Sequence, residues 1–122
     1  NIIVIDGNKV KELNIDNYRL MVDADAMISD YSSSGTDFLH TGRPIAYTLD
    51  DLTEYRLGFI VENPKDLMPG MKIYCFNDLI DFFELLNNGT DEYYNQRKLI
   101  LNRMFTFHDG NSCSRLAEHI GL

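Results

Sequence analysis

Short apolar runs alternate along the chain with polar stretches that carry turn and helix-capping residues. An apolar run without polar interruption is typical of a strand buried on both faces, as in a parallel sheet. Four such runs predict strands, at residues 2–5, 26–29, 45–49 and 58–61. Residues 6–8 have the composition of a turn, and residues 63–70 that of a loop.

Capping residues predict helices between these strands. Asp16 or Asn17 can accept the first N–H groups of a short helix over residues 18–23. Ser34 and Asp37 have the spacing of a capping box, in which each side chain bonds the backbone N–H of the other residue. The next helix is therefore expected to begin at this pair.

Residues 76–122 show the periodicity of helices rather than of strands. Asn77 can cap a first helix, and Asp91 can open a second one. A loop over 108–112 precedes a last helix over 113–120. The apolar positions expected to face inward are Leu79, Ile80, Phe83 and Leu86 in the first helix, and Tyr94, Leu101 and Met104 in the second.

Strands that alternate with helices predict an α/β fold on a Rossmann-like parallel sheet, with a helical C-terminal third. The 122 residues fit a single domain, with 1–61 as its α/β part and 76–122 as its mainly helical part. The chain begins without Met and inside a predicted strand, which favours a piece of a longer protein. An incomplete sheet would either pair residues 2–5 with 26–29 directly or dimerise through an open edge.

Charge and cysteine content narrow the classes of function. The chain has 11 Lys and Arg against 19 Asp and Glu, a formal net charge of -8. Nucleic-acid binding normally requires a basic patch, so this balance argues against such a partner. Cys75 and Cys113 share no metal-ligand spacing, which predicts free thiols and no metal site. No apolar run approaches the ~20 residues of a membrane-spanning helix.

The stretch Asp-Tyr-Ser-Ser-Ser-Gly at residues 30–35 carries the strongest chemical signal. It lies where a predicted strand ends and a helix begins, at the sheet edge where α/β proteins bind ligands. The free N–H groups of a helix start attract anions, and serine hydroxyls donate further hydrogen bonds. The loop therefore predicts a site for a phosphate-bearing ligand. The alternative is that Ser32, Ser33 and Ser34 only cap the helix.

Six motifs, in order along most of the chain, resemble those of the CDP-glycerol glycerophosphotransferases. They are Asp30-Tyr-Ser-Ser33 with Asp37-Phe38, Arg43-Pro-Ile45, Asp51-Leu52 with Glu54-Tyr-Arg56, Gly58-Phe59, Pro69-Gly70, and Asp109-Gly110 with Ser112, Cys113 and Arg115. One position departs from the family, which often carries Glu before the final Arg, where this chain has Ser114.

The resemblance implies the C-terminal, donor-binding part of a two-domain GT-B enzyme. Such enzymes transfer glycerol phosphate or a similar polyol phosphate from a CDP-linked donor to teichoic acids or capsular polymers. No metal or other cofactor is implied. The resemblance implies that the acceptor-binding N-terminal domain and the first part of the donor domain are missing from this chain. The histidine base would lie in that missing part. The full protein is expected in the cytoplasm, at the inner face of the cell membrane, and the isolated chain is expected to be inactive.

The candidate substrate-binding residues, from the serine loop and the motifs together, are Asp30, Ser32, Ser33, Ser34, Gly35, Asp37, Arg56, Asp109, Gly110, Ser112 and Arg115. Several of them have a structural alternative. Asp30 can orient the serine loop instead of binding substrate, and Asp37 can act only as a capping partner. Arg56 and Arg115 can clamp a phosphate or remain surface residues. His108 can act as a general acid or base, or be an exposed loop residue.

Two other classes of function remain open from the sequence. One is a GT-B glycosyltransferase that uses a nucleotide sugar. The other is a non-catalytic, receiver-like α/β module, because Asp6 and Asp30 both follow predicted strands, as phosphoacceptor residues do.

Overall fold

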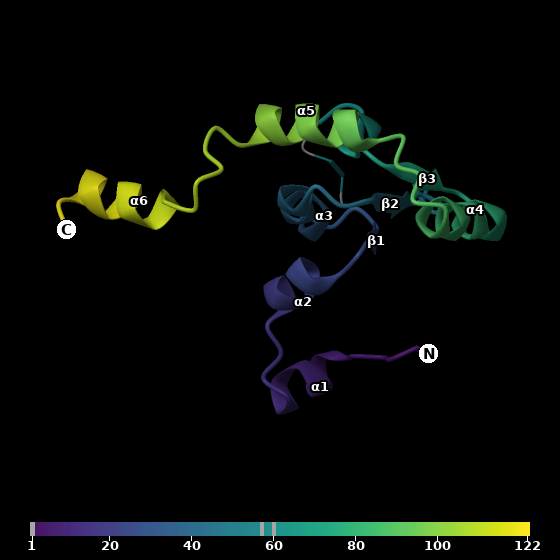
Figure 1. The fold of residues 1–122 in the computed structure, drawn as a ribbon, viewed down its shortest axis with the longest axis horizontal. Coiled ribbons are helices and arrows are strands. Elements are labelled where there is room, and N and C mark those ends of the chain that lie inside the picture. Colours follow the sequence, from purple (N-terminus) through teal and green to yellow (C-terminus); the bar gives the residue numbers. More distant parts are fainter. Residues whose placement is uncertain (1, 57, 60) are drawn as a thin grey trace.

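Three short parallel strands, in the order β1-β2-β3, form the centre of the molecule (Figure 1). In this computed structural model, which describes residues 2–56, 58–59 and 61–122, they are β1 (Met27–Ser29), β2 (Ile45–Thr48) and β3 (Met71–Ile73). Ser29 pairs with Tyr47, and Tyr47 in turn with Lys72. The predicted α/β fold with a parallel sheet is confirmed.

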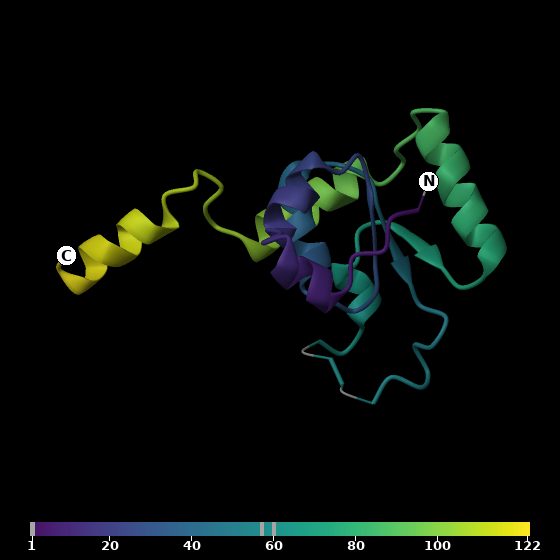
Figure 2. The ribbon, with the colours of Figure 1, turned by 90° about the horizontal axis from the view of Figure 1, so that it is seen from below.

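Helices surround this sheet on both faces and extend beyond it. They are α1 (Gly7–Glu12), α2 (Asn17–Asp23), α3 (Ser34–Phe38), α4 (Phe76–Asn87), α5 (Tyr94–Met104) and α6 (Ser112–Ile120), with 3-10 turns η1 (Leu39–Thr41) and η2 (Pro64–Leu67). Helix α3 contacts β1, α4 contacts β3, and α5 lies over η1. Helix α6 lies beyond the end of α5, away from the sheet, in both views (Figure 1 and Figure 2).

The hydrophobic core has two parts, one on each face of β2. Successive side chains of a strand point to opposite faces, so the apolar run at β2 supplies both parts. One part gathers Phe38, Leu39, Ile45, Tyr47, Leu49, Met68 and Ile100. The other gathers Ala46, Ile73 and Phe82. Because β2 is covered on both faces, it has the environment that its uninterrupted apolar sequence predicts.

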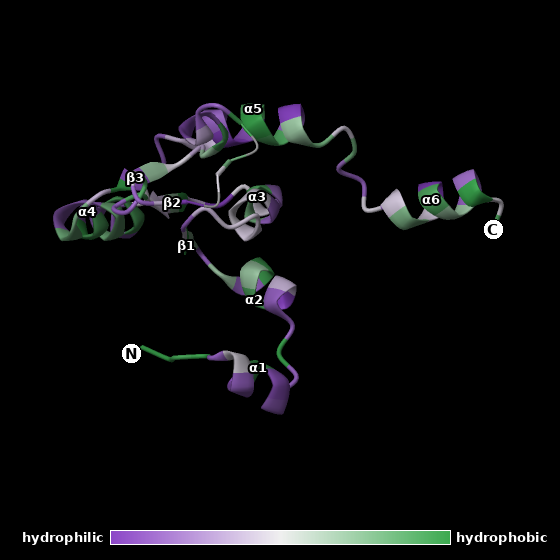
Figure 3. Ribbon diagram, turned by 180° about the vertical axis from the view of Figure 1, so that it is seen from behind, coloured by the Kyte–Doolittle hydropathy of each residue, from purple (hydrophilic) through white to green (hydrophobic). Residues whose placement is uncertain are grey.

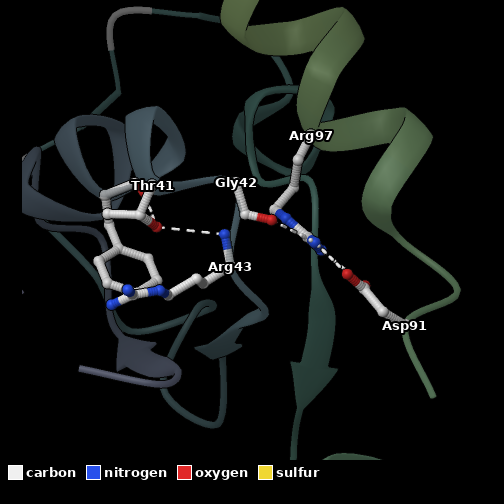
Figure 4. A network of polar contacts seen from close by, with 6 residues as sticks. Thr41, Gly42, Arg43, Asp91 and Arg97 are labelled. Atoms are coloured by element: carbon white, nitrogen blue, oxygen red, sulfur yellow. Dashed lines mark hydrogen bonds and ion pairs between the residues drawn. The ribbon is translucent and has the colours of Figure 1, made fainter. Parts of the chain in front are cut away.

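Arg97 joins α5 to the sheet layer from inside the protein. Its side chain is only 2% exposed. The guanidinium forms an ion pair with Asp91, with Nη1 donating to Asp91 Oδ1 at 2.9 Å. Nη2 donates to the carbonyl oxygen of Gly42 at 3.0 Å (Figure 4). Gly42 has a φ of 69°, the left-handed conformation that glycine adopts readily. This contact links residues 55 positions apart in the chain.

The prediction of a buried strand at residues 2–5 is wrong. This segment has no strand pairing, and Ile2 is 94% exposed; its apolar residues appear green in Figure 3. A buried strand needs a neighbouring strand to satisfy its backbone, and the sheet contains only β1, β2 and β3 among the described residues. The turn predicted at 6–8 is also wrong. Asp6 instead caps α1 by accepting hydrogen bonds from the N–H groups of Asn8 and Lys9.

The strand predicted at 58–61 is not formed by the residues described there, and Ile60 lies outside the described residues. Gly58 has a φ of 75°, which is incompatible with extended strand geometry. The third strand is β3, where no strand was predicted from the sequence. Lys72 interrupts its apolar residues, so no continuous run marks it. The predicted loop at 63–70 also contains the turn η2.

Helix locations are confirmed more often than the residues that cap them. Asp16 caps α2, as expected. The capping box of Ser34 and Asp37 is wrong, because Ser33 is the N-cap of α3 and makes no capping bond among the described residues. Ser33 already has helical dihedral angles, and Asp37 instead accepts a hydrogen bond from the Tyr18 hydroxyl at 3.3 Å.

The caps predicted for α4 and α5 also differ. Helix α4 begins after Cys75, and Asp78 accepts the N–H groups of Tyr74 and Cys75 at 2.8 and 3.0 Å. These bonds hold the pKa of Asp78 below its ordinary value. Asp91 does not cap α5, since it pairs with Arg97.

The inward faces of α4 and α5 were predicted only in part. Leu79 and Leu86 pack on the core as expected, but Phe82 is buried in place of Phe83, which is exposed. On α5, Leu101 packs on the core, whereas Tyr94 and Met104 are exposed.

Candidate functional site: a pocket beside the serine loop

A pocket of about 250 Å³ opens beside the carboxyl end of β1. Its polar wall is the serine loop (residues 30–35). Most of the remaining lining comes from the segment between β2 and β3, and Thr36 of α3, Tyr47 of β2 and Met104 of α5 also contribute. Figure 2 shows this long connecting segment extending below the sheet. The pocket therefore lies at the sheet edge where parallel α/β folds bind ligands.

Hydrogen bonds within the serine loop hold its shape. The carboxylate of Asp30 accepts the N–H of Ser32 at 2.9 Å. The hydroxyl oxygens of Ser32 and Ser34 lie 2.8 Å apart. Both Ser32 and Ser33 are exposed and line the pocket. Their hydroxyls are thus in position to donate to an anion, while Asp30 fixes the turn that presents them.

Gly35 and Asp37 are not part of the lining of this pocket. Gly35 is buried against the sheet, and a Cβ placed there would lie 3.2 Å from Cε1 of Tyr47 and 3.4 Å from Oγ of Ser29. Its lack of a side chain thus allows α3 to pack closely on β1 and β2. Asp37 lines a separate pocket of about 410 Å³ between α2 and η1, together with Tyr18 and Arg43.

Three aromatic residues that line the pocket, Tyr31, Tyr55 and Phe59, form a cluster of rings. The centroid of Tyr31 lies 4.3 Å from that of Tyr55 and 5.4 Å from that of Phe59. The Tyr31 hydroxyl donates to Asp51 Oδ1 at 2.7 Å. Burial, together with this bond and the negative charge of Asp51, raises the pKa of Tyr31, so its hydroxyl stays a donor at neutral pH.

None of these three rings was among the site residues predicted from the sequence. A signal was present, because each ring belongs to one of the motifs that resemble the family: Asp-Tyr-Ser-Ser, Glu-Tyr-Arg and Gly-Phe.

The last motif forms a cluster of its own, away from the pocket. Arg115 donates to both carboxylate oxygens of Asp109 at 3.0 and 2.9 Å, and its guanidinium lies 3.9 Å from the ring centroid of Phe107. The bond from Arg115 and the N–H of Asn111 lower the pKa of Asp109 to about 2. Gly110 and Ser112 belong to the same turn, ahead of or at the start of α6. In this structure, the group is not brought together with the serine loop (Figure 1).

Arg56 and His108 are both exposed and lie outside the pocket lining. The His108 ring centroid lies 5.7 Å from that of His40, beside Phe105. Residues 2–56, 58–59 and 61–122 contain no group of three His, Cys, Asp or Glu side chains able to hold a metal ion. No helix in the described part of the chain has both the length and the apolar character needed to cross a membrane.

The parallel sheet, with a pocket at the carboxyl end of β1 and serine hydroxyls on its wall, defines a Rossmann-like α/β domain. Residues 3–122 match the family model described as CDP-Glycerol:Poly(glycerophosphate) glycerophosphotransferase, and the chain belongs to this family.

Two curated proteins are similar to the chain. A teichoic acid glycerol-phosphate transferase of Staphylococcus aureus (strain NCTC 8325 / PS 47) is 30% identical over 100 residues, which cover 80% of this chain and 25% of that protein. A teichoic acid glycerol-phosphate primase of Bacillus subtilis (strain 168) is 30% identical over 104 residues, which cover 84% and 26%. The chain thus spans about a quarter of the length of these relatives. No solved structure matches the chain.

The structure removes part of the support for one alternative function, the receiver-like module. The receiver-like module rested on Asp6 and Asp30 both following strands. Asp6 does not follow a strand in the structure, so that pairing of acidic residues is lost.

Proposed function

We propose that this chain is the donor-binding part of a transferase that moves a polyol phosphate from a CDP-linked donor to a growing teichoic-acid-like or capsular polymer. Family membership over residues 3–122 supports the reaction class. The observation that carries the proposal is the pocket whose wall presents Ser32 and Ser33. Asp30 holds that wall in place through the N–H of Ser32.

In the proposed reaction, an acceptor hydroxyl attacks the β-phosphorus of the donor. A new P–O bond forms, the bond from that phosphorus to the bridging oxygen breaks, and CMP leaves. Ser32 and Ser33 would donate to the diphosphate oxygens, on which negative charge shifts during transfer. The net charge of -8 makes such local donors necessary, because the overall field repels an anion.

The rest of the proposed enzyme is assigned outside this chain. It comprises the other domain of a GT-B fold, the polymer acceptor site and the general base. The longer protein would act in the cytoplasm, at the inner face of the membrane, without a metal or other cofactor. The 122 residues alone would bind nucleotide weakly, without turnover, and associate as a homodimer through exposed apolar surface.

Calorimetry with CDP-glycerol tests the proposal. Each hydrogen bond from a serine hydroxyl to a charged oxygen contributes about 1.5 kcal/mol or more. The double variant Ser32→Ala/Ser33→Ala loses two such bonds and should therefore bind CDP-glycerol about a hundredfold more weakly. Ser114→Ala, which changes an exposed serine of α6, is the matched control and should bind as the unaltered chain does.

Unchanged binding by the double variant would reject the serine loop as the donor site. Robust transfer catalysed by the 122 residues alone would reject the assignment of the base to another part of the protein. Displacement of CDP-glycerol by a UDP-sugar at similar concentration would favour a nucleotide-sugar glycosyltransferase instead.

A further inference from the structure

The lining of the pocket beside the serine loop combines two chemically different sets of residues, called here its polar end and its aromatic end. Asp30, Ser32, Ser33 and Thr36 make one end polar. Tyr55, Phe59, Val61, Leu67 and Met68 make the other end apolar and partly aromatic. A ligand that fills both ends needs an anionic group joined to a flat, largely apolar one. A nucleoside diphosphate has this composition.

The aromatic end presents a ring surface to the pocket. The rings of Tyr55 and Phe59 are stacked, with centroids 4.9 Å apart and planes inclined by 25°. The ring of Tyr31 meets Phe59 edge-on, at 66°. Phe59 is 36% exposed and lines the pocket. A planar ring of a ligand can therefore extend the stack of Tyr55 and Phe59, in the offset arrangement that aromatic rings prefer.

Asp51 links the aromatic residues to the serine loop through two hydrogen bonds. The side chain of Asp51 accepts the hydroxyl of Tyr31 at 2.7 Å, and its carbonyl oxygen accepts the N–H of Tyr55 at 3.1 Å. Tyr31 directly precedes Ser32 in the chain. The spacing between the rings and the serine hydroxyls is thus held by backbone and hydrogen bonds.

Charge assigns the two parts of such a ligand to the two ends. The carboxylate of Asp51 accepts the Tyr31 hydroxyl, and the charges of Asp51 and Asp50 both raise the pKa of Tyr31, so these two negative charges lie near the aromatic rings. A diphosphate would be repelled there. An uncharged base carries no such penalty, and an exocyclic amino group can donate to a carboxylate.

We propose that Phe59 and Tyr55, held in place by Tyr31, form a stacking platform for the base of the donor nucleotide. This proposal rests on the proposed function, since it divides the same pocket into a diphosphate end and a base end. Phe59 contacts the base directly, and Tyr31 is a positioning residue.

Binding of CDP and of inorganic pyrophosphate distinguishes the proposed base end of the pocket from its diphosphate end. The unaltered chain, Phe59→Leu, Phe59→Tyr and Ser32→Ala/Ser33→Ala are titrated with CDP and with inorganic pyrophosphate. Phe59→Leu should weaken CDP binding about tenfold, the loss of one base–aromatic stack, and leave pyrophosphate binding unchanged. Phe59→Tyr keeps an aromatic face and should bind CDP normally. The serine variant should weaken both probes.

A matched control and a second readout keep the test specific. Phe76→Leu changes an exposed aromatic residue at the start of α4 and should leave both probes unaffected. The chain has 7 Tyr and no Trp, so its fluorescence reports on tyrosine. CDP should quench this emission more strongly than pyrophosphate does, because only CDP carries a base.

CDP binding unchanged in Phe59→Leu but weakened in the serine variant would overturn the platform and leave the proposed function standing. A chain that binds no CDP, or binds it equally well without the two serine hydroxyls, would overturn the proposed function as well.

Discussion

Asp109 and Arg115 belong to the last motif shared with the family, and each is the other's partner. Arg115 approaches both oxygens of the Asp109 carboxylate, the two-pronged geometry that arginine favours. In this structure its guanidinium is occupied by Asp109, Ser112 and the ring of Phe107. At the residue scale, the motif therefore holds the turn that leads into α6.

The titration of Asp109 should depend on Arg115. The folded pKa of about 2 lies below the ordinary value, so the contact is present above about pH 4 and is lost as pH falls toward 2. In Arg115→Met the Asp109 pKa should rise toward about 3.9. NMR of the carboxyl carbon measures it. Arg103→Met, at an exposed position of α5, is the control. An Asp109 midpoint near 4 in the unaltered chain would contradict the contact.

At the scale of elements, the approach to β3 depends on a glycine. A Cβ at Gly70 would lie 2.0 Å from the carbonyl oxygen of Ile45, in β2. The Nζ atom of Lys72 donates to the carbonyl oxygens of Met68 and Gly70, which precede it in the chain. The Pro69-Gly70 pair thus allows the chain to enter the sheet directly beside β2.

Gly70→Ala should destabilise the protein strongly. The added methyl group meets backbone, which cannot move aside as a side chain can, so we expect a loss of about 2 kcal/mol or more in the free energy of unfolding. Gly7→Ala is the control, because a Cβ there meets nothing within 4 Å. It should be neutral or slightly stabilising, since alanine favours the first turn of α1. Urea unfolding compares the two, and equal stabilities would contradict the close approach.

At the scale of the whole molecule, residues 2–5 and α6 extend away from a small hydrophobic core. The buried apolar residues lie in the sheet, in α3, α4 and α5 and in the segments next to them, whereas residues 2–5 and α6 expose Ile3, Leu116, Ile120 and other large apolar side chains (Figure 3). Exposed apolar surface of this extent favours association. The predicted homodimer remains a prediction.

Arg97 should determine how firmly α5 is attached to the sheet layer. Arg97→Met keeps the length and apolar stem but leaves Asp91 and the Gly42 carbonyl oxygen without their partner. Breaking a buried ion pair in this way should cost about 3 kcal/mol in the free energy of unfolding. Lys98→Met changes the neighbouring exposed residue of the same helix and should cost little. A thermal or urea unfolding curve of Arg97→Met that matched this control would show that the pair contributes nothing.

The sequence by itself determined the order of elements from residue 16 to 49, the parallel sheet, the position of the serine loop and membership of the family. These follow from local signals: apolar runs, caps and contiguous motifs. Only the tertiary structure decided that residues 2–5 are not a strand, that Met71–Ile73 is one, that Arg97 is buried, and that Tyr31, Tyr55 and Phe59 gather at one pocket. The physical reason is that strand pairing and burial depend on the residues across the sheet, which the periodicity of a single segment does not contain.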